Sequence, residues 1–485
     1  MRGLVWLKKD LRLHDNPALY HACHVCDEGV SVVYVLDLEM WKKNNTSHYQ
    51  ITFILESLAL LKEDLLKKNI SFFIDVAHKT EDVPKLLLKH AVNINVGSLF
   101  FNEEYEINEA RRNSAVESVF LKNTMLVEKF HDQLILPFQD VKTQQGEYFK
   151  VFTAFKRQWL VRYMQQQPLL RPIPTSNVML DAPPSAVSSS LMKRLAGSID
   201  LSQWAPGERA AKKCLKKFIA ADLFDYDKYR DFPLQDKTSK LSPYLAVGMI
   251  SPRLCFHAAY VENACEASSG NKGALTWMSE LIWREFYRHI LIAVPRVCMN
   301  QAYQVETEKL PWCYREDLFH AWTQGKTGYP LVDAAMRQLN TTGWMHNRLR
   351  MVAAMFLSKN LFLDWRLGEK YFEEHLIDID FASNNGGWQW SASTGTDAVP
   401  YFRVFNPIMQ SQRFDPKGDF IRLYVPELRE FTQKTIHEPY QLDPEKAKRS
   451  GYPEPIVAHK ETRQFVIAEF KKLKYSSPQE NKHRD

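Results

Sequence analysis

Residues 378–407, DIDFASNNGGWQWSASTGTDAVPYFRVFNP, have the residue types of a site that binds a flat ring carrying several polar atoms. The NNGGWQW run at residues 384–390 combines asparagine, glycine and tryptophan and has no aliphatic side chain. Asparagine amides both donate and accept hydrogen bonds, glycines permit a close backbone approach or a positive φ, and tryptophans supply flat surfaces with one N–H each. This composition is not that of a core helix or strand. The alternative is a glycine turn beside two core tryptophans.

A second candidate group lies in the run TWMSELIWREFYRHI, residues 276–290. Glu280, Trp283 and Arg284 are spaced i, i+3 and i+4, which places them on one face of a helix. A carboxylate beside a tryptophan on a pocket wall could contact the edge of a neutral base. The alternative is an exposed Glu–Arg pair worth a few tenths of a kcal/mol.

Two further runs could bind a ligand. Asn347, Arg348 and Met351 in TGWMHNRLRM are spaced i, i+1 and i+4, although an amphipathic helix with solvated arginines and a core methionine would show the same pattern. In TSKLSPYLAVG, residues 238–248, small hydroxyl side chains come directly before a proline. Hydroxyls and backbone N–H groups at the start of a helix can hold an anion, and they are also a common helix cap.

Composition places the chain among globular proteins, with 45% hydrophobic and 25% charged residues over 485 positions. The net charge of +6 permits a polyanionic partner without requiring one. Of the 12 tryptophans, eight lie between Trp277 and Trp390, which a chromophore site or a redox chain explains better than a helical core.

Cysteine content and hydropathy give three further expectations. Seven cysteines, an odd number, and no signal peptide predict reduced thiols and a cytoplasmic protein. The Cys23–Cys26 pair has no second pair at zinc spacing, so we expect no metal site. No apolar run is long enough to cross a membrane.

Residues 1–135 are predicted to form a doubly wound α/β domain. The predicted strands are residues 3–8, 30–36, 70–76 and 96–102, and the predicted helices are residues 51–69 and 84–91. Continuous apolar runs are typical of parallel strands covered on both faces, and their alternation with helices predicts a doubly wound sheet. The G-x-G-x-x-G fingerprint of dinucleotide-binding domains is absent.

The rest of the chain is predicted to be helical. Residues 136–205 are expected to be a connector, because their second half is rich in proline and serine and has little hydrophobic periodicity. Residues 206–470 repeat apolar positions at i, i+3 and i+4 and predict a larger all-α domain. Residues 471–485 are expected to be a flexible tail.

Several of these runs together resemble the photolyase/cryptochrome family. They are VWLKKDLRLHDNPAL at 5–19, TSKLSPYLAVG at 238–248, TWMSELIWREFYRHI at 276–290, GKTGYPLVDAAMRQL at 325–339, TGWMHNRLRM at 342–351 and the Asn-Asn-Gly-Gly-Trp segment. The resemblance covers most of the chain and makes the helical domain an FAD-binding domain.

The resemblance implies which residues bind FAD, folded so that its adenine lies over the isoalloxazine ring. They are Tyr226, Thr238, Ser239, Lys240, Leu241, Ser242, Trp277, Glu280, Arg284, Trp344, Asn347, Arg350, Asp378, Asp380 and Asn384. Asn384 faces flavin N5, and Arg350 pairs with Asp378 against the ring. An asparagine at position 384 is typical of photolyases, whereas the main cryptochrome groups carry aspartate or cysteine there.

The resemblance also implies a lesion pocket, an electron path and a DNA surface. The catalytic set is Glu280, Trp283, Asn347, Met351, Asn384 and Trp390. Electrons reach the flavin through Trp312, Trp365 and Trp388. DNA is bound by Arg230, Trp283, Arg348 and Arg403, with Lys156 and Arg157 as weaker candidates.

The implied activity is light-dependent repair, in which reduced FAD (FADH−) donates an electron that splits a cyclobutane pyrimidine dimer. We expect a monomer that binds UV-damaged DNA of any sequence. Asn108 and Glu109 coincide with residues that bind a 5,10-methenyltetrahydrofolate antenna, although Asn44 stands where folate-binding relatives often carry histidine. A deazaflavin or an empty antenna site is the alternative.

Two other activities within the family fit less well. A (6-4) photolyase typically has a HHLARH-like run where this chain has MHNRLR. A cryptochrome would bind FAD without repairing DNA, and many cryptochromes carry a long C-terminal extension where this sequence ends soon after the helical domain.

Overall fold

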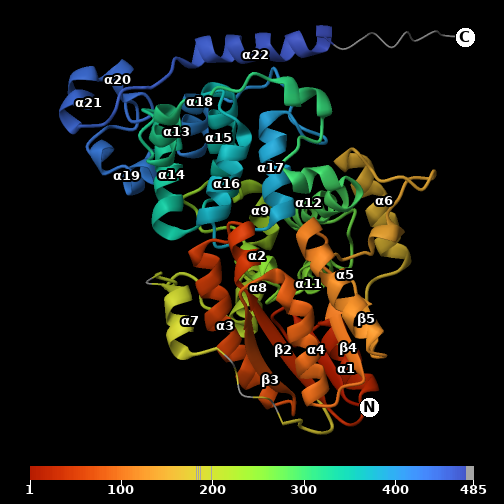
Figure 1. Cartoon of the computed structure of the whole chain (residues 1–485). Helices are drawn as coiled ribbons and strands as arrows, with labels where there is room; N and C mark the ends of the chain where they lie inside the picture. Colours follow the sequence, from red (N-terminus) through yellow and green to blue (C-terminus); the bar gives the residue numbers. More distant parts are fainter. Residues whose placement is uncertain (182, 184, 186, 198, 477–485) are drawn as a thin grey trace, which may run out of the picture. The chain divides into compact units, whose positions relative to one another are not determined.

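The computed structural model describes residues 1–476 except 182, 184, 186 and 198 (Figure 1). Its contacts divide the chain into two compact units, each described by itself below. Unit 1 consists of Met1–Lys228, Lys237–Ala293 and Leu376–Ala382. Unit 2 consists of Tyr229–Asp236, Val294–His375 and Ser383–Asp485.

Unit 1 is built on a five-stranded sheet. Its strands are β1 (Gly3–Leu7), β2 (Val30–Asp37), β3 (Ser71–Ala77), β4 (Ser98–Asn102) and β5 (Leu126–Phe130). All pairs are parallel and the order is β3-β2-β1-β4-β5, which confirms the predicted doubly wound sheet. Strand β5 was not among the predicted strands, because its sequence LVEKF is short and half-polar and the strand lies at the sheet edge.

One face of the sheet is covered by α4 (Val83–Asn93) and α5 (Ile107–Lys122), which lie side by side in Figure 1. Leu4, Trp6 and Phe101 from the strands pack there against Leu87 and Phe120 from the two helices. Each of these side chains is at most 2% exposed, so the sheet is a rigid base for the loops at its carboxyl edge.

The other helices of unit 1 surround the sheet or follow it in sequence. They are α1 (Pro17–Val25), α2 (Leu38–Lys43), α3 (His48–Leu66), α6 (Phe152–Gln165), α7 (Ser189–Ala196), α8 (Glu208–Ala221), α9 (Tyr226–Tyr229), α10 (Ser242–Ala246), α11 (Pro252–Glu262) and α12 (Lys272–Ala293). Short 3₁₀ helices η1 (Thr80–Asp82), η2 (Phe138–Asp140) and η3 (Leu223–Asp225) connect them.

In the described part of unit 2 no strand occurs, and a single isolated bridge joins Cys313 to Leu363. Its helices are α13 (Glu316–Thr323), α14 (Pro330–Thr342), α15 (Asn347–Met355), a π-helix η6 (Phe356–Asn360), α16 (Trp365–His375), α18 (Pro407–Phe414), α19 (Asp419–Tyr424), α20 (Pro439–Leu442), α21 (Pro444–Ser450) and α22 (His459–Ser476), with 3₁₀ helices η4 (Pro295–Met299), η5 (Val305–Lys309) and η7 (Pro426–Leu428). The prediction of an α/β domain followed by helices is confirmed.

The sequence prediction was wrong for the NNGGWQW run, which is helical. It lies inside α17 (Phe381–Ala392), and Asn384, Asn385 and Trp388 are buried. Two adjacent glycines and two asparagines disfavour an isolated helix, so the helix depends on side-chain contacts with its neighbours.

The predicted boundaries at residues 135, 205 and 470 stay predictions. Residues 1–228 belong to one compact unit by contacts, and α6 within the expected connector buries Phe155 and Trp159. The predicted tail begins inside α22, and residues 477–485 lie outside the described residues. Among the helices described, none is long and apolar enough to cross a membrane.

Candidate functional site

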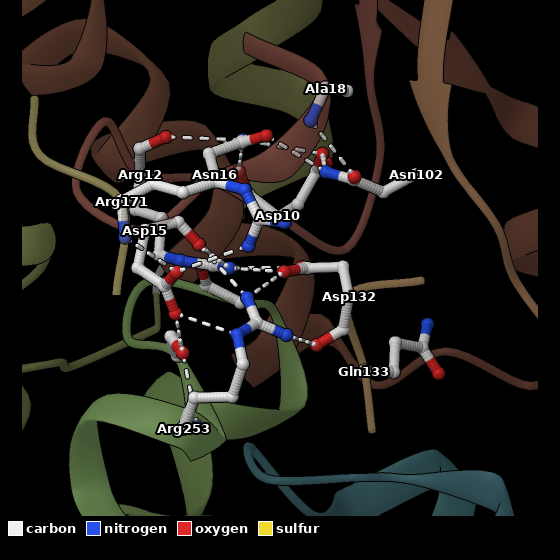
Figure 2. Close-up of polar contacts among 12 residues, drawn as sticks. Asp10, Arg12, Asp15, Asn16, Ala18, Asn102, Asp132, Gln133, Arg171 and Arg253 are labelled. Atoms are coloured by element: carbon white, nitrogen blue, oxygen red, sulfur yellow. Dashed lines mark hydrogen bonds and ion pairs between the residues drawn. The ribbon is translucent and has the colours of Figure 1, made fainter. Parts of the chain in front are cut away.

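The carboxyl end of β1 carries a buried network of charged side chains from the DLRLHDN run (Figure 2). Asp132 accepts from Arg12 Nη1 at 3.1 Å and from Arg253 Nη2 at 2.7 Å, and Arg253 Nε donates to Asp15 at 2.8 Å. Burial alone would raise the pKa of Asp132, but the two guanidinium groups hold it below its ordinary value. The network joins the loop after β1 to α11, so we assign this run a structural role.

The predicted antenna residues stand at the start of α5. Asn108 is exposed and Glu109 is buried. Asn44 Nδ2 donates to Glu109 Oε1 at 2.6 Å, and Lys9 Nζ lies 3.8 Å from the same oxygen. The structure therefore joins Glu109 to the loop at residues 41–48, and antenna binding stays a prediction.

Helix α12 presents the predicted lesion and flavin residues of unit 1. Trp283 stacks on Phe152 with ring centroids 3.6 Å apart and planes 11° from parallel. Trp277 packs against Phe218 at 5.0 Å. Glu280 is partly exposed, and its charge acts on the nearby Lys156. The pKa of Lys156 is nevertheless lowered, because burial of the lysine outweighs the charge of Glu280.

The Arg284 side chain bonds to the protein backbone and is not simply a solvated surface group paired with Glu280. Its Nη1 donates to the carbonyl oxygen of Gln133 at 2.8 Å. Burial and the neighbouring Arg288 lower the pKa of Arg284 to about 10. The alternative of an exposed Glu–Arg pair is therefore wrong for Arg284.

The segment before α10 has a backbone shaped for an anion. Lys240 has a left-handed φ of +49°, and Leu241 follows with φ −87° and ψ −6°. A change of hand between neighbouring residues turns successive N–H groups toward one side, as in anion-binding nests. Thr238, Ser239 and Ser242 belong to this segment, and Cys214 Sγ fixes it by donating to the Ser239 carbonyl at 3.1 Å. Tyr226 packs edge-on against Phe218, which also contacts Trp277.

Unit 1 also contains the predicted aspartates. Gln50 Nε2 donates to the carbonyl oxygens of Ile377 and Ile379, which fixes the backbone beside Asp378. Asp380 forms an ion pair with Arg288. Arg288 was missed by sequence reasoning, although a charged residue at a core-spaced position of an amphipathic helix could have indicated it.

In unit 2, the start of α15 gathers predicted DNA and flavin residues. His346 caps the helix by accepting from the Arg348 N–H at 3.2 Å, and burial lowers the pKa of His346 to about 4, so the ring is neutral. Arg348 pairs with Asp231 at 2.9 Å, and Arg230 Nε lies 3.9 Å from the same carboxylate. Asp231 thus holds two predicted phosphate-binding arginines together.

The remaining predicted residues of this segment differ in exposure. Asn347 is exposed, whereas Trp344 and Met351 are partly buried. Arg350 Nε donates to the Met345 carbonyl at 2.8 Å. Its pairing with Asp378 stays a prediction.

Hydrogen bonds to Glu369 on α16 hold α17 against that helix. Asn384 Nδ2 donates to the Glu369 carbonyl at 3.1 Å, and Asn385 Nδ2 donates to Glu369 Oε1 at 2.7 Å. A methyl group added at Gly387 would meet no protein atom within 4 Å, so packing within the protein does not require this glycine. Open space beside an oriented amide fits a flat polar ring.

Glu369 is a buried carboxyl that sequence reasoning missed. Burial, and then repulsion from Glu373, raise its pKa to about 8. Ionisation therefore opposes folding progressively as the pH rises from the unfolded pKa, near 4.5, through 8.

Glu369→Gln is expected to raise the free energy of unfolding, by an amount that grows with pH to about 1–4 kcal/mol at pH 8. Glutamine keeps the oxygen that accepts from Asn385 and removes the charge. Urea unfolding at pH 5 and pH 8 measures the difference. An equal effect at both pH values would contradict the assignment of a buried, titrating carboxyl.

Contacts within unit 2 link the three predicted redox tryptophans. The Cys313 N–H donates to the Phe362 carbonyl at 2.8 Å, which brings Trp312 close to the start of α16 at Trp365. Gly368 lies one turn after Trp365 and packs against the indole of Trp388. Trp365 and Trp388 are at most 2% exposed, whereas Trp312 is 8% exposed. Sequence separation alone could not connect them.

The Gly368–Trp388 contact leaves no room for a larger residue. A Cβ at Gly368 would lie 2.1 Å from Trp388 Cη2. Gly368→Ala is expected to lower the free energy of unfolding by about 1–3 kcal/mol through overpacking, measured by urea unfolding. Adding Trp388→Phe should recover part of that loss, and an unchanged midpoint in the single variant would contradict the contact.

The two cysteines of the CxxC motif have pKa values above the ordinary value of a thiol. Burial is the main cause that raises the pKa of Cys23 to about 12 and of Cys26 to about 11. No group of three or more potential metal ligands occurs among the residues that the structure describes.

Two family models match separate parts of the sequence. Residues 3–175 match the DNA photolyase family model, and residues 277–472 match the FAD binding domain of DNA photolyase. The deoxyribodipyrimidine photo-lyases of Escherichia coli K12 and Salmonella typhimurium LT2 are each 42% identical over 473 residues, covering 96% of this chain and 98% of the relative.

Two solved structures are similar to this chain over nearly its whole length. A class III photolyase from Agrobacterium tumefaciens superimposes with a TM-score of 0.87 at 34% identity, covering 98% of both chains. The Synechocystis cryptochrome superimposes with a TM-score of 0.86 at 27% identity, covering 97% of this chain and 99% of that one. From both family models and from the 42% identity to relatives over 96% of its length, the chain belongs to the photolyase/cryptochrome family.

Proposed function

We propose that this protein is a deoxyribodipyrimidine photo-lyase that uses light to split cyclobutane pyrimidine dimers in DNA. The observation that carries the proposal is the Asn384 amide, whose nitrogen donates to the Glu369 carbonyl. Held this way, the amide presents its oxygen as an acceptor for an N–H on a bound ring. Curated relatives that match 96–97% of this chain carry this enzyme's name.

FAD is the cofactor, and when reduced it supplies the electron that splits the dimer. The residues proposed to hold it fall into two sets. In unit 1, they are the backbone at residues 238–242, which would hold the diphosphate, and Tyr226, Trp277, Arg284, Asp378 and Asp380. In unit 2, they are Trp344, Asn347, Arg350 and Asn384.

The proposed lesion-binding residues combine flat surfaces with one carboxylate. Trp283, already stacked on Phe152, offers its other surface to a base, and Glu280 accepts from a pyrimidine N–H. Asn347, Met351 and Trp390 complete the set from unit 2. Bases that are damaged and poorly stacked leave the duplex at a cost of about a few kcal/mol.

Binding begins with phosphates. Arg230, Arg348 and Arg403 are proposed to contact the damaged strand, with exposed Arg157 and partly buried Lys156 beside it. Asp231 lies 3.9 Å from Arg230 Nε and 2.9 Å from Arg348 Nη2, so it keeps the first two arginines close together. Phosphate contacts carry no sequence information, which favours UV-damaged DNA of any sequence as the partner.

Affinity for dimer-containing DNA is expected to fall steeply with salt. Three phosphate contacts predict a slope of about −3 in log K against log salt, because each releases about 0.9 counterion. Fluorescence anisotropy between about 50 and 200 mM KCl measures it. A flat profile would remove the three-arginine surface from the proposal.

The proposed function also includes an antenna chromophore, a division into domains and an oligomeric state. Methenyltetrahydrofolate is the antenna, beside Asn108 and Glu109. Residues 1–135 form the antenna domain and residues 206–470 the FAD and DNA domain, joined by a connector. The protein acts as a cytoplasmic monomer.

The test is repair of dimer-containing oligothymidylate by reduced holoprotein, with and without near-UV or blue light. Recovery of thymine absorbance only in light is the expected result. No recovery, with FAD bound and reduced, would overturn the proposal. Repair of a (6-4) lesion or light-driven change without repair would then identify a (6-4) photolyase or a cryptochrome.

A further inference from the structure

Lys359 occupies an unusual position for a charged side chain. It has no exposed surface and lies in the π-helix η6, which follows α15. π-helical turns are rare and are frequently found at functional sites. Burial of an ammonium group opposes folding unless hydrogen bonds compensate it.

The ammonium group contacts two parts of one segment. Lys359 Nζ donates to Ser393 Oγ at 2.7 Å and to the Arg403 carbonyl at 3.2 Å. Burial is the only cause that shifts its pKa, which falls to about 7. The compensation for burial therefore comes from these neutral acceptors.

The two contacts of Lys359 lie at the two ends of residues 393–403, the segment that follows α17. Ser393 has a left-handed φ of +62°, and its hydroxyl donates to the Val399 carbonyl at 2.6 Å. The Val399 N–H in turn donates to the Trp390 carbonyl at 3.3 Å. Lys359 thus ties the beginning of this segment, at Ser393, to its far part, at Arg403.

Arg403 differs from Lys359 in exposure. Its side chain is exposed, and its N–H closes a turn by donating to the Pro400 carbonyl at 2.8 Å. A side chain on a turn keeps one direction only if the turn is anchored. In this segment the contact between the Lys359 ammonium and the Arg403 carbonyl is the anchor at Arg403 itself, and Tyr401, two residues earlier, stacks on Phe470.

We propose that Lys359 is a positioning residue for DNA binding, which holds residues 393–403 from the interior so that Arg403 faces the phosphates. The proposal rests on the proposed function, because it requires Arg403 to contact DNA. A methionine of similar length would fill the space, but it would leave the Arg403 carbonyl and the Ser393 hydroxyl without their donor. Loss of that donor would free the Arg403 backbone, so the lysine fixes the direction of the Arg403 side chain.

The experiment compares Lys359→Met, Lys359→Gln, Arg403→Ala and the double variant Lys359→Met/Arg403→Ala as FAD-loaded full chains. The dissociation constant for a dimer-containing duplex is measured in the dark as a function of KCl. Lys359→Met is expected to bind about tenfold more weakly, with a salt slope reduced by about 1. Arg403→Ala should show the same slope, and the double variant should lose little more.

Two variants separate positioning from other effects. Lys359→Gln keeps a donor and should restore part of the affinity. Lys370→Met removes the same charge from a side chain that is 61% exposed on α16 and should leave the slope unchanged. Ser393→Ala removes the other acceptor and gives a second test if Lys359→Met does not fold.

The outcomes distinguish this inference from the proposed function. If the wild type does not prefer dimer-containing DNA, both are overturned. If the wild type prefers it and Lys359→Met keeps the wild-type slope and affinity, only the role of Lys359 is overturned. Additive losses in the double variant would also overturn it, because Lys359 would then act independently of Arg403.

Discussion

Trp312→Phe is expected to block light-driven reduction of oxidised FAD while leaving repair by chemically reduced protein intact. The three tryptophans are linked within unit 2, from the Cys313–Phe362 hydrogen bond through Trp365 to the Gly368–Trp388 contact. Trp312 is the most exposed of the three, so it is the proposed point at which electrons from solvent enter the path. Phenylalanine is much harder to oxidise than tryptophan and interrupts the path.

The burial of the inner indoles supports this direction of transfer. The Nε1–H groups of Trp365 and Trp388 have no hydrogen-bond partner in the described part of the chain. An oxidised indole there has no acceptor for its proton, so the positive charge is expected to move on to the tryptophan nearest solvent.

Photoreduction is measured by the loss of oxidised-flavin absorbance under blue light with an external thiol, and the rate should fall by more than an order of magnitude. Trp322→Phe is the matched control. Trp322 lies 6.1 Å from Trp388 but donates to the Ala353 carbonyl and is not part of the proposed path. If Trp322→Phe blocked reduction and Trp312→Phe did not, electrons would enter through Trp322 instead.

Glu280→Ala is expected to reduce light-driven repair and dimer binding while leaving FAD bound. Loss of a hydrogen bond to a desolvated base costs about 1–3 kcal/mol, or roughly 5-fold to 150-fold in affinity. Glu280 shares a helix face with Trp283, whose stacking on Phe152 fixes the surface beside it. Glutamine at the same position keeps an acceptor and should be less affected.

Repair yield per absorbed photon and the dissociation constant for dimer-containing DNA provide the measurement. FAD content from absorbance shows whether the flavin is retained. Glu262→Ala, on the exposed surface of α11, controls for the loss of one negative charge. Wild-type repair and binding in Glu280→Ala would remove Glu280 from the lesion pocket.

Local periodicity was sufficient for several features. The strands β1 to β4 were predicted because parallel strands buried on both faces are continuous apolar runs. The grouping of Glu280, Trp283 and Arg284 followed from spacing on one helix. Strand β5 escaped prediction because an edge strand lacks that apolar signal.

Local propensity failed where distant side chains decide the conformation. The NNGGWQW run forms a helix because Asn384 and Asn385 bond to Glu369 on α16, which offsets the low helix propensity of glycine and asparagine. Buried charged residues were missed for a related reason. Nothing near Lys359 in sequence indicates that its acceptors lie at Ser393 and Arg403.

The sequence by itself therefore determined the family, the doubly wound sheet, the helical FAD-binding region and the residue types of each site, because these depend on local patterns and on long motifs. The tertiary structure decided which residues meet. The link from Trp312 to Trp388, the orientation of Asn384 and the burial of Lys359 each depend on contacts between residues far apart in the chain. Such contacts arise from packing, which has no period in the sequence.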